Sequence, residues 1–162
     1  MAIRLEPADR TNWREMIALK LHPEQETFVA PPIKSLAMCY VRAWGEEYDY
    51  LPFVIRDENA VVGYVTLVCD PLSADDYWID DIMIDAAHQG KGYGRQALNL
   101  VLRLIAGKYP RCAKIRLTCF RGNVNAAALY LSVGFVKTGR MTPEFLEPEY
   151  SLSGAALDKF RA

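Results

Sequence analysis

The stretch IDDIMIDAAHQGKGYGRQAL, residues 79–98, combines the end of a strand, a glycine-rich turn and the start of a helix. Alternating apolar and polar residues in DYWIDDIMID (76–85) predict the strand. The three glycines of the turn let the backbone approach a ligand without an intervening Cβ. Lys91 and Arg95 add positive charge beside the N–H groups of the helix N-terminus. Because such a terminus attracts anions, we expect an anion-binding turn here.

Two common phosphate-binding loops fit this turn less well. The P-loop pattern GxxxxGK[ST] is absent. The dinucleotide pattern GxGxxG/A does occur at Gly92, Gly94 and Ala97, after a strand and before a helix. A dinucleotide site also needs an acidic residue about 20 residues downstream to hold a ribose. No Asp or Glu lies between Asp85 and Glu144, which disfavours a Rossmann-like protein.

Hydrophobic spacing and chain breakers predict the elements on either side of this unit. Strands are expected at residues 3–6, 51–57, 61–70, 76–85, 114–119, 135–138 and 149–153. Helices are expected at residues 12–20, 35–44, 95–108 and 125–132, with Asn12 and Ser35 as caps of the first two. Phe28, in the connector between those helices, is expected in the core, and a place in the substrate pocket is the alternative. The order indicates one α/β domain over residues 1–162, with a mixed sheet flanked by helices.

The composition argues against several broad classes of protein. A net charge of −1 argues against nucleic acid as the main partner. No apolar run reaches the roughly 18 residues of a membrane helix, and the N-terminus MAIRLEPADR has no apolar signal region. The four cysteines form no CxxC pair, and His22 and His88 have no third metal ligand nearby. We therefore expect a cytoplasmic protein with reduced cysteines, no metal and no membrane partner.

Charge is segregated along the chain despite the small net value. Residues 46–85 contain 11 acids and one base, whereas residues 86–121 contain eight bases and no acid. Solvation at the surface is a sufficient explanation for most of these charges. The contrast between the two segments nevertheless suggests two unlike ligands, one cationic and one anionic.

Two motifs, in the right order, resemble those of GNAT-type N-acetyltransferases, which bind acetyl-CoA. Gln89–Gly94 (QGKGYG) fits the signature Q/R-x-x-G-x-G/A, and Asn123–Phe135 fits the downstream pattern N-x-x-A-x-x-L-Y-x-x-x-G-F. Within the family, EQETFVA, SLA and YWIDDIMIDAAHQGKGYG are similar to the bacterial spermine/spermidine acetyltransferase branch. The resemblance implies a GNAT-like fold, whose central mixed sheet is mostly antiparallel and is flanked by helices.

The resemblance also implies how acetyl-CoA is bound. The backbone of the strand before the turn pairs with the pantetheine arm, which adds itself like an extra strand. The pyrophosphate lies on the amides of the turn, and Asn123 hydrogen-bonds the pantetheine. The implied cofactor-binding residues are Ile82, Met83, Ile84, Gln89, Gly90, Lys91, Gly92, Tyr93, Gly94, Arg95, Asn123 and Tyr130.

Tyr130 is the acid that the resemblance implies. Its place in the motif puts it near the thioester sulfur, where it protonates the departing thiolate. A tyrosine of pKa about 10 is a workable acid for a thiolate whose thiol has a pKa of about 8.5. Two structural roles stay open at this point: Tyr130 as a core aromatic residue, and Asn123 as a helix N-cap.

The amine substrate needs a base, because an alkyl ammonium of pKa about 10 is almost fully protonated at pH 7. Asp80 is the preferred base, and Asp81 is the partner that holds the cation. Alternation along a strand points the two side chains to opposite faces, so both reach one pocket only if a bulge intervenes. An aspartate of ordinary pKa is a poor direct base, so a relayed water or a raised pKa is required.

The acidic segment predicts a small cationic substrate, with a polyamine as the first choice. Glu46, Tyr48 and Trp78 are expected to bind it with Asp80 and Asp81, because a polyamine needs carboxylates separated by aromatic walls. An amino acid, an aminoglycoside or a peptide amine is the alternative substrate. A CoA-binding regulatory module without turnover is the alternative class. Residues 147–162 run past the expected last strand, which leaves a homodimer open.

Overall fold

A seven-stranded sheet forms the centre of the computed structural model, which describes residues 2–162. The strands are β1 (Arg4–Pro7), β2 (Asp49–Arg56), β3 (Val61–Cys69), β4 (Tyr77–Ile84), β5 (Lys114–Thr118), β6 (Val136–Met141) and β7 (Pro148–Ser153). The helices are α1 (Trp13–Ile17), α2 (Pro32–Val41), α3 (Tyr93–Lys108), α4 (Val124–Val133) and α5 (Gly154–Asp158), with short 3-10 helices η1 (Pro23–Gln25) and η2 (Ala86–His88). All seven predicted strands and all four predicted helices are present in the predicted order.

The strands lie in the order β1-β2-β3-β4-β5-β7-β6. Every neighbouring pair is antiparallel except β4 and β5, which run parallel. A sheet in which a single pair is parallel is mixed and mostly antiparallel, which confirms the predicted fold class.

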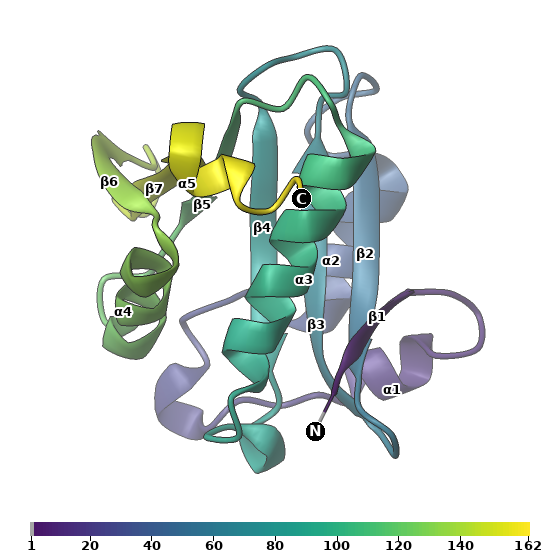
Figure 1. Cartoon of the computed structure of the whole chain (residues 1–162). Helices are drawn as coiled ribbons and strands as arrows, with labels where there is room; N and C mark the ends of the chain where they lie inside the picture. Colours follow the sequence, from purple (N-terminus) through teal and green to yellow (C-terminus); the bar gives the residue numbers. More distant parts are fainter. Residues whose placement is uncertain (1) are drawn as a thin grey trace.

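β4 and β5 begin side by side and then separate. Tyr77 pairs with Ile115 and Trp78 pairs with Arg116, and the ladder then ends. Figure 1 shows β5, β6 and β7 turning away from β4 and the rest of the sheet. Within residues 2–162, the edge of β4 that faces β5 therefore has no strand partner beyond Trp78, and its backbone is available to a ligand.

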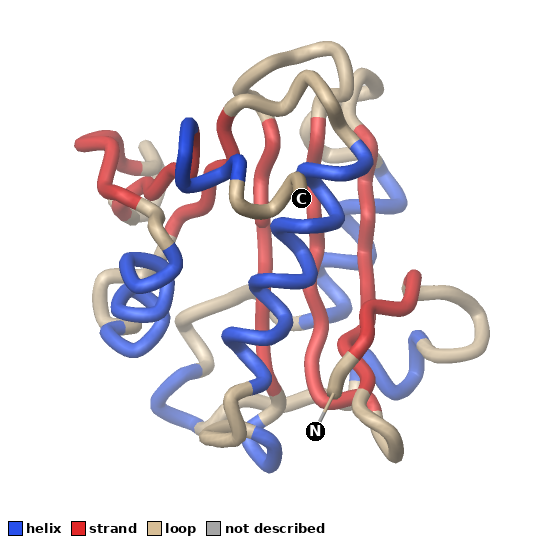
Figure 2. Tube along the Cα trace, in the orientation of Figure 1, coloured by secondary structure: helices blue, strands red, loops and turns tan. Residues whose placement is uncertain are grey.

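Helices cover both faces of the sheet, as Figure 1 and Figure 2 show. On one face α3 packs on the strands, with Leu98 in the same buried cluster as Phe53. On the other face α1 and α2 pack, with Met16 in a cluster with Val54. Neighbouring residues of β2 thus face opposite layers, as side chains in a strand do. Because both faces are covered, β3 is buried along its whole length.

Two predicted helix caps are wrong. α2 begins at Pro32 rather than at residue 35, because proline suits the first turn of a helix, where its missing N–H costs nothing. Ser35 therefore lies inside α2, where it is buried and does not cap the helix. The Asn12 side chain does not cap α1 either, since its Oδ1 accepts from the Asp9 N–H at 2.9 Å. Both helices also end three residues earlier than predicted.

Residues 147–162 complete the sheet. β7 lies between β5 and β6, and its residues 149–152 are buried. α5, which the sequence did not predict, contacts α3 and β7 and buries Leu157. The four cysteines are free, as predicted. Within residues 2–162 no helix has both the length and the apolar character to cross a membrane.

Candidate active site

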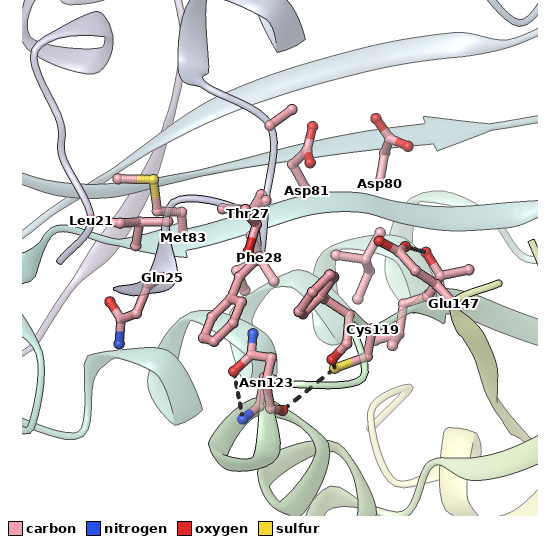
Figure 3. Close-up of a pocket in the computed structure, with 18 of the residues that line it drawn as sticks. Leu21, Gln25, Thr27, Phe28, Asp80, Asp81, Met83, Cys119, Asn123 and Glu147 are labelled. Carbon is pink, nitrogen blue, oxygen red and sulfur yellow. Dashed lines mark hydrogen bonds between the residues drawn. The ribbon is translucent and has the colours of Figure 1, made fainter. Parts of the chain in front are cut away.

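The separation of β4 and β5 opens a cleft of about 1390 Å³. β4 lines it with residues 79–84, and β5 with the loop that follows lines it with residues 117–120. The segment between α1 and α2 and the start of α4 complete the walls. Figure 3 shows Asp80 and Asp81 rising from one side of this cleft, with Cys119 and Glu147 on the other.

A β-bulge in β4 brings both aspartates to the cleft. Thr66 of β3 pairs with Asp81, but Leu67 pairs with Ile79, which leaves Asp80 as the extra residue. Both aspartates line the cleft, and Figure 3 shows their side chains next to each other. The bulge that a shared pocket requires is therefore present.

Asp81 is held by a hydrogen bond from α2. The Ser35 hydroxyl donates to Asp81 Oδ2 at 2.6 Å and lies 3.4 Å from the Tyr64 hydroxyl oxygen. Tyr64 in turn donates to the Ala30 carbonyl at 2.5 Å. Because α2 begins one turn before Ser35, this serine points into the molecule and fixes one of the two carboxylates.

The pKa of both carboxyl groups is raised. For Asp80, burial is the main cause and the charge of Asp81 is the next, and together they raise its pKa to about 7. Burial also raises the pKa of Asp81, against the opposing effect of the Ser35 hydrogen bond. Lys34 lowers both pKa values without cancelling the shift. A carboxyl of pKa near 7 is matched to proton transfer at neutral pH, as a direct base requires.

The glycine turn between η2 and α3 presents backbone amides to the cleft. Gly90 and Gly92 have φ of +77° and +80°, which other residues adopt only with strain. A Cβ built on either glycine meets nothing within 4 Å, so the space in front of both is open. The N–H groups of Gly90, Lys91, Gly92 and Gly94 have no acceptor within residues 2–162. Open space beside unpaired amides at a helix N-terminus fits a pyrophosphate.

The glutamine of the motif fixes the turn to the end of β4. Gln89 Nε2 donates to the Ile84 carbonyl at 3.1 Å, and its amide pairs with that of Gln25 in η1. Residues 82–84 pair with β3 on one edge and have no partner on the edge toward β5. The open strand edge and the open turn are thus continuous, as a long, partly anionic ligand such as CoA requires.

The two basic side chains of the turn do not line the cleft, and the hydroxyl of its tyrosine is bonded elsewhere. Tyr93 is buried, and its hydroxyl donates to Asp57 at 3.0 Å. Arg95 donates to the Ser132 hydroxyl at 2.9 Å, and neither Arg95 nor the exposed Lys91 lines the cleft. The backbone of this turn, rather than its basic side chains, therefore forms the cleft surface.

Asn123 and Tyr130 combine structural positions with access to the cleft. Asn123 Oδ1 accepts from the Ala126 N–H at 3.3 Å and caps α4. Tyr130 is 7% exposed and packs against the rings of Phe135 and Tyr150, yet both Asn123 and Tyr130 line the cleft. The Tyr130 hydroxyl has no hydrogen-bond partner among the described residues 2–162. Burial raises the pKa of Tyr130, so its phenol carries a proton at neutral pH.

Residues 13–135 match the Acetyltransferase (GNAT) family. This chain belongs to the GNAT acetyltransferase family. The match covers the β4 bulge, the glycine turn, Asn123 and Tyr130, which are the parts that form the cleft. It confirms the predicted class of the protein, an N-acetyltransferase that uses acetyl-CoA as its acyl donor.

Several named proteins resemble this GNAT chain in sequence or structure. A spermine/spermidine N(1)-acetyltransferase from Bacillus subtilis is 27% identical over 146 residues, which cover 87% of this chain and 92% of the relative. A spermidine N-acetyltransferase from Vibrio cholerae, solved with CoA and spermine, gives a TM-score of 0.73 at 21% identity and covers 96% of this chain and 97% of its own. The aminoglycoside acetyltransferase AAC(6')-Ib, solved with coenzyme A, gives 0.72 at 15% identity, with 99% and 100% covered.

An aromatic pair that the sequence did not predict closes part of the GNAT cleft. The ring centroids of Phe28 and Phe120 lie 5.4 Å apart, and both residues line the cleft. Figure 3 shows Phe28 beside Asn123. The expectation that Phe28 is a core residue is therefore wrong, and the alternative, a place in the pocket, is the one observed. The connector that carries it has no helical or strand period, so the sequence offered no sign of which way its side chain points.

Acidic side chains outnumber basic ones along the cleft. The carboxylates are Glu24, Asp80, Asp81, Glu144 and Glu147. Lys34 is the one lysine or arginine among the described residues that line it. This balance favours a ligand group with positive charge over one with negative charge in the part of the cleft that Asp80 and Asp81 line.

The structure does not bring three predicted substrate residues into this cleft. Glu46 is 85% exposed at its side chain and forms an ion pair with Arg42 at 2.6 Å. The Tyr48 hydroxyl donates to Asp76 at 2.6 Å. Trp78 lines a second, smaller pocket next to the cleft. These residues were selected by composition along the chain, which does not specify where a loop places its side chains.

Proposed function

We propose that this chain transfers the acetyl group of acetyl-CoA to a primary amine of a polyamine such as spermidine or spermine. The observation that carries the proposal is the pair Asp80 and Asp81 at the β4 bulge. The charged residues that line the cleft around them are mostly acidic. Two adjacent buried carboxylates repel each other, and a cationic amine placed between them relieves that repulsion. The similarity to a Bacillus subtilis spermine/spermidine acetyltransferase agrees with this choice.

Acetyl-CoA occupies the other part of the cleft in this proposal. The unpaired edge at Ile82, Met83 and Ile84 pairs with the pantetheine arm, and Asn123 hydrogen-bonds that arm. The amides of residues 89–94 bind the pyrophosphate, and Lys91 and Arg95 contribute charge from nearby rather than contact. The unpaired amides and the open space before Gly90 and Gly92 support this placement.

Asp80 acts as the base on the amine. The substrate enters as an ammonium, and a carboxyl of pKa about 7 accepts its proton far more readily than an ordinary aspartate does. The freed nitrogen then attacks the thioester carbonyl carbon. Asp81, held by Ser35, stays in place beside the cation and orients it.

Tyr130 acts as the acid on the thiolate. When the C–S bond of the tetrahedral intermediate breaks, its hydroxyl gives a proton to the CoA sulfur. The nitrogen loses a second proton as the amide forms, and that proton restores Tyr130. One turnover therefore yields the N-acetylated amine, CoA with a free thiol, and one proton released to solvent through Asp80.

Thiol release from acetyl-CoA tests the proposal directly. Purified protein is assayed at neutral and alkaline pH with spermidine, spermine, putrescine, neutral amino acids, an aminoglycoside and a peptide. We expect saturable turnover with polyamines that is lost in Asp80→Asn and weakened in Asp81→Asn. Turnover confined to a neutral or acidic amine contradicts the polyamine assignment, whereas tight CoA binding with no turnover on any amine favours a regulatory module.

A further inference from the structure

A second pocket of about 310 Å³ adjoins the cleft on the far side of Asp80. Trp44, Asp80 and Thr118 are among the residues that line both spaces, so the pocket begins where the reacting end of the cleft stops. Trp44 lines it from the turn after α2, Trp78 from β4 and Glu149 from β7. Trp78 and Glu149 line this pocket but not the main cleft.

Two indole rings form an aromatic corner of the pocket. The ring centroids of Trp44 and Trp78 lie 5.7 Å apart with their planes at 69°. Trp78 Nε1 donates to Asp76 at 2.7 Å, which fixes the orientation of that ring. The guanidinium of Arg116 lies 5.6 Å from the Trp78 ring centroid, so this ring already accepts one cation within the protein.

A buried carboxylate faces the same pocket with spare hydrogen-bonding capacity. Glu149 is 7% exposed, and its Oε2 accepts from the Thr138 hydroxyl at 2.7 Å. Its Oε1 has no partner within residues 2–162. This oxygen is not among the buried polar atoms that lack a partner, so it is accessible from the pocket, and an ammonium group placed there can donate to it.

Arg140 also lines this pocket, but it forms no ion pair with Glu149 and so does not neutralise that carboxylate. Arg140 is exposed, and its side chain forms no salt bridge within residues 2–162. An exposed guanidinium remains hydrated without contacting Glu149, so the carboxylate remains available to a ligand.

We infer that this pocket binds the second, non-reacting ammonium group of a di- or polyamine. The inference rests on the proposed function and adds to it a site that selects substrates by their number of cationic groups. The reacting amine lies at Asp80 and Asp81, and the methylene chain passes Thr118 into the pocket. There the far ammonium donates to Glu149 Oε1 and contacts the ring faces of Trp44 and Trp78. A monoamine of the same chain length reaches only the first site.

The test compares a polyamine with a matched monoamine. Steady-state kinetics are measured with spermine, spermidine, putrescine and n-butylamine for the wild type, Glu149→Gln and Trp78→Leu, because Glu149 and Trp78 line this pocket but not the main cleft. Gln keeps the shape of Glu and its bond to Thr138, and Leu keeps a bulky apolar side chain on β4, so at least one variant should fold. The control is Glu58→Gln, which removes one negative charge from an exposed residue outside both pockets.

We expect Glu149→Gln to raise KM for the best polyamine about tenfold, because the negative charge that pairs with the far ammonium is lost, and Trp78→Leu to raise it about threefold, because the cation–π contact is lost. KM for n-butylamine and for acetyl-CoA should not change, and Glu58→Gln should match the wild type for every substrate. An unchanged polyamine KM, or an equal rise for n-butylamine, overturns the subsite alone. A wild-type protein that acetylates no polyamine overturns the proposed function as well, so the two failures are distinguishable.

Discussion

At the residue scale, one extra residue in β4 decides where two carboxylates point. Without the bulge, Asp80 and Asp81 would face opposite sides of the sheet. With it, both line the cleft, and their burial and mutual repulsion raise the pKa of Asp80 to about 7. Ser35 also makes the two carboxyl groups unequal. Its hydrogen bond to Asp81 holds that group, which leaves Asp80 as the carboxyl that exchanges a proton more freely.

Tyr130→Phe should lower kcat about 100-fold while KM for acetyl-CoA stays unchanged, because only proton donation to the thiolate is lost. The free energy of unfolding should stay within about 0.5 kcal/mol of the wild type, since the Tyr130 hydroxyl has no partner to lose within residues 2–162. Tyr150→Phe is the matched control, a buried neighbouring tyrosine that does not line the cleft. Full activity in Tyr130→Phe would rule out its role as the acid.

Whether a single residue lines the cleft could be predicted where a motif or a strand contained the residue. It could not be predicted where composition alone had selected the residue. Asp80, Asp81 and Tyr130 lie on regular elements with a defined register, and all three line the cleft. Glu46 and Tyr48 lie in the turn between α2 and β2, and local partners hold their side chains elsewhere.

At the scale of single elements, the turn between η2 and α3 provides the most specific feature. The N–H groups of Gly92 and Gly94 have no acceptor within residues 2–162, because a helix that begins at Tyr93 leaves its first N–H groups without internal acceptors. Positive φ at Gly90 and Gly92 turns those groups toward open space. The side chain of Gln89 then fixes the turn to the end of β4.

Gly92→Ala should raise KM for acetyl-CoA, because the new methyl group occupies the space in front of the amides. It should also lower the free energy of unfolding by about 1 kcal/mol, since alanine is strained at positive φ. Gly139→Ala is the control for strain: its φ is +84°, its Cβ also meets nothing within 4 Å, and it lies outside the cleft. Equal KM values for acetyl-CoA in the two variants would place the pyrophosphate elsewhere.

The elements themselves followed from periodicity, whereas the segment between α1 and α2 did not. Residues 21–31 contain prolines and no sustained apolar period, so their path depends on contacts with distant residues. That segment supplies Phe28 to the cleft, and the helix that follows supplies Ser35. Both contributions depend on tertiary packing that a local pattern does not encode.

At the scale of the whole molecule, the separation of β4 from β5 creates both proposed binding regions. It leaves one edge of β4 without a strand partner within residues 2–162, and the same gap contains the aspartate pair. The fold keeps two carboxylates in a poorly hydrated position, which lowers the free energy of unfolding. The function of the site and the stability of the protein therefore oppose each other here.

Asp80→Asn should therefore stabilise the protein at pH 8 and have little effect at pH 4. The pKa of Asp80 rises from 3.8 to about 7 on folding, so the folded state holds a proton that the unfolded state releases between those values. The free energy of unfolding accordingly falls as pH rises from about 4 to about 7. Removing this titration should restore about 4 kcal/mol at pH 8, at about 1.4 kcal/mol for each unit of the pKa change. Thermal melts at both pH values, with Glu58→Gln as the control, measure the effect, and equal shifts at the two pH values would contradict it.

The pH dependence of kcat/KM for spermidine is the most direct measurement of whether Asp80 removes the proton from the amine. In the wild type, kcat/KM should rise about tenfold per pH unit below pH 7 and level off above it, at the pKa of Asp80 in the free enzyme. In Asp80→Asn the rise of kcat/KM with pH below pH 7 should disappear, and kcat/KM should be at least about 100-fold lower at pH 8. A wild-type profile that keeps rising toward the amine pKa of about 10, and that Asp80→Asn leaves unchanged, would contradict the assignment of Asp80 as the base.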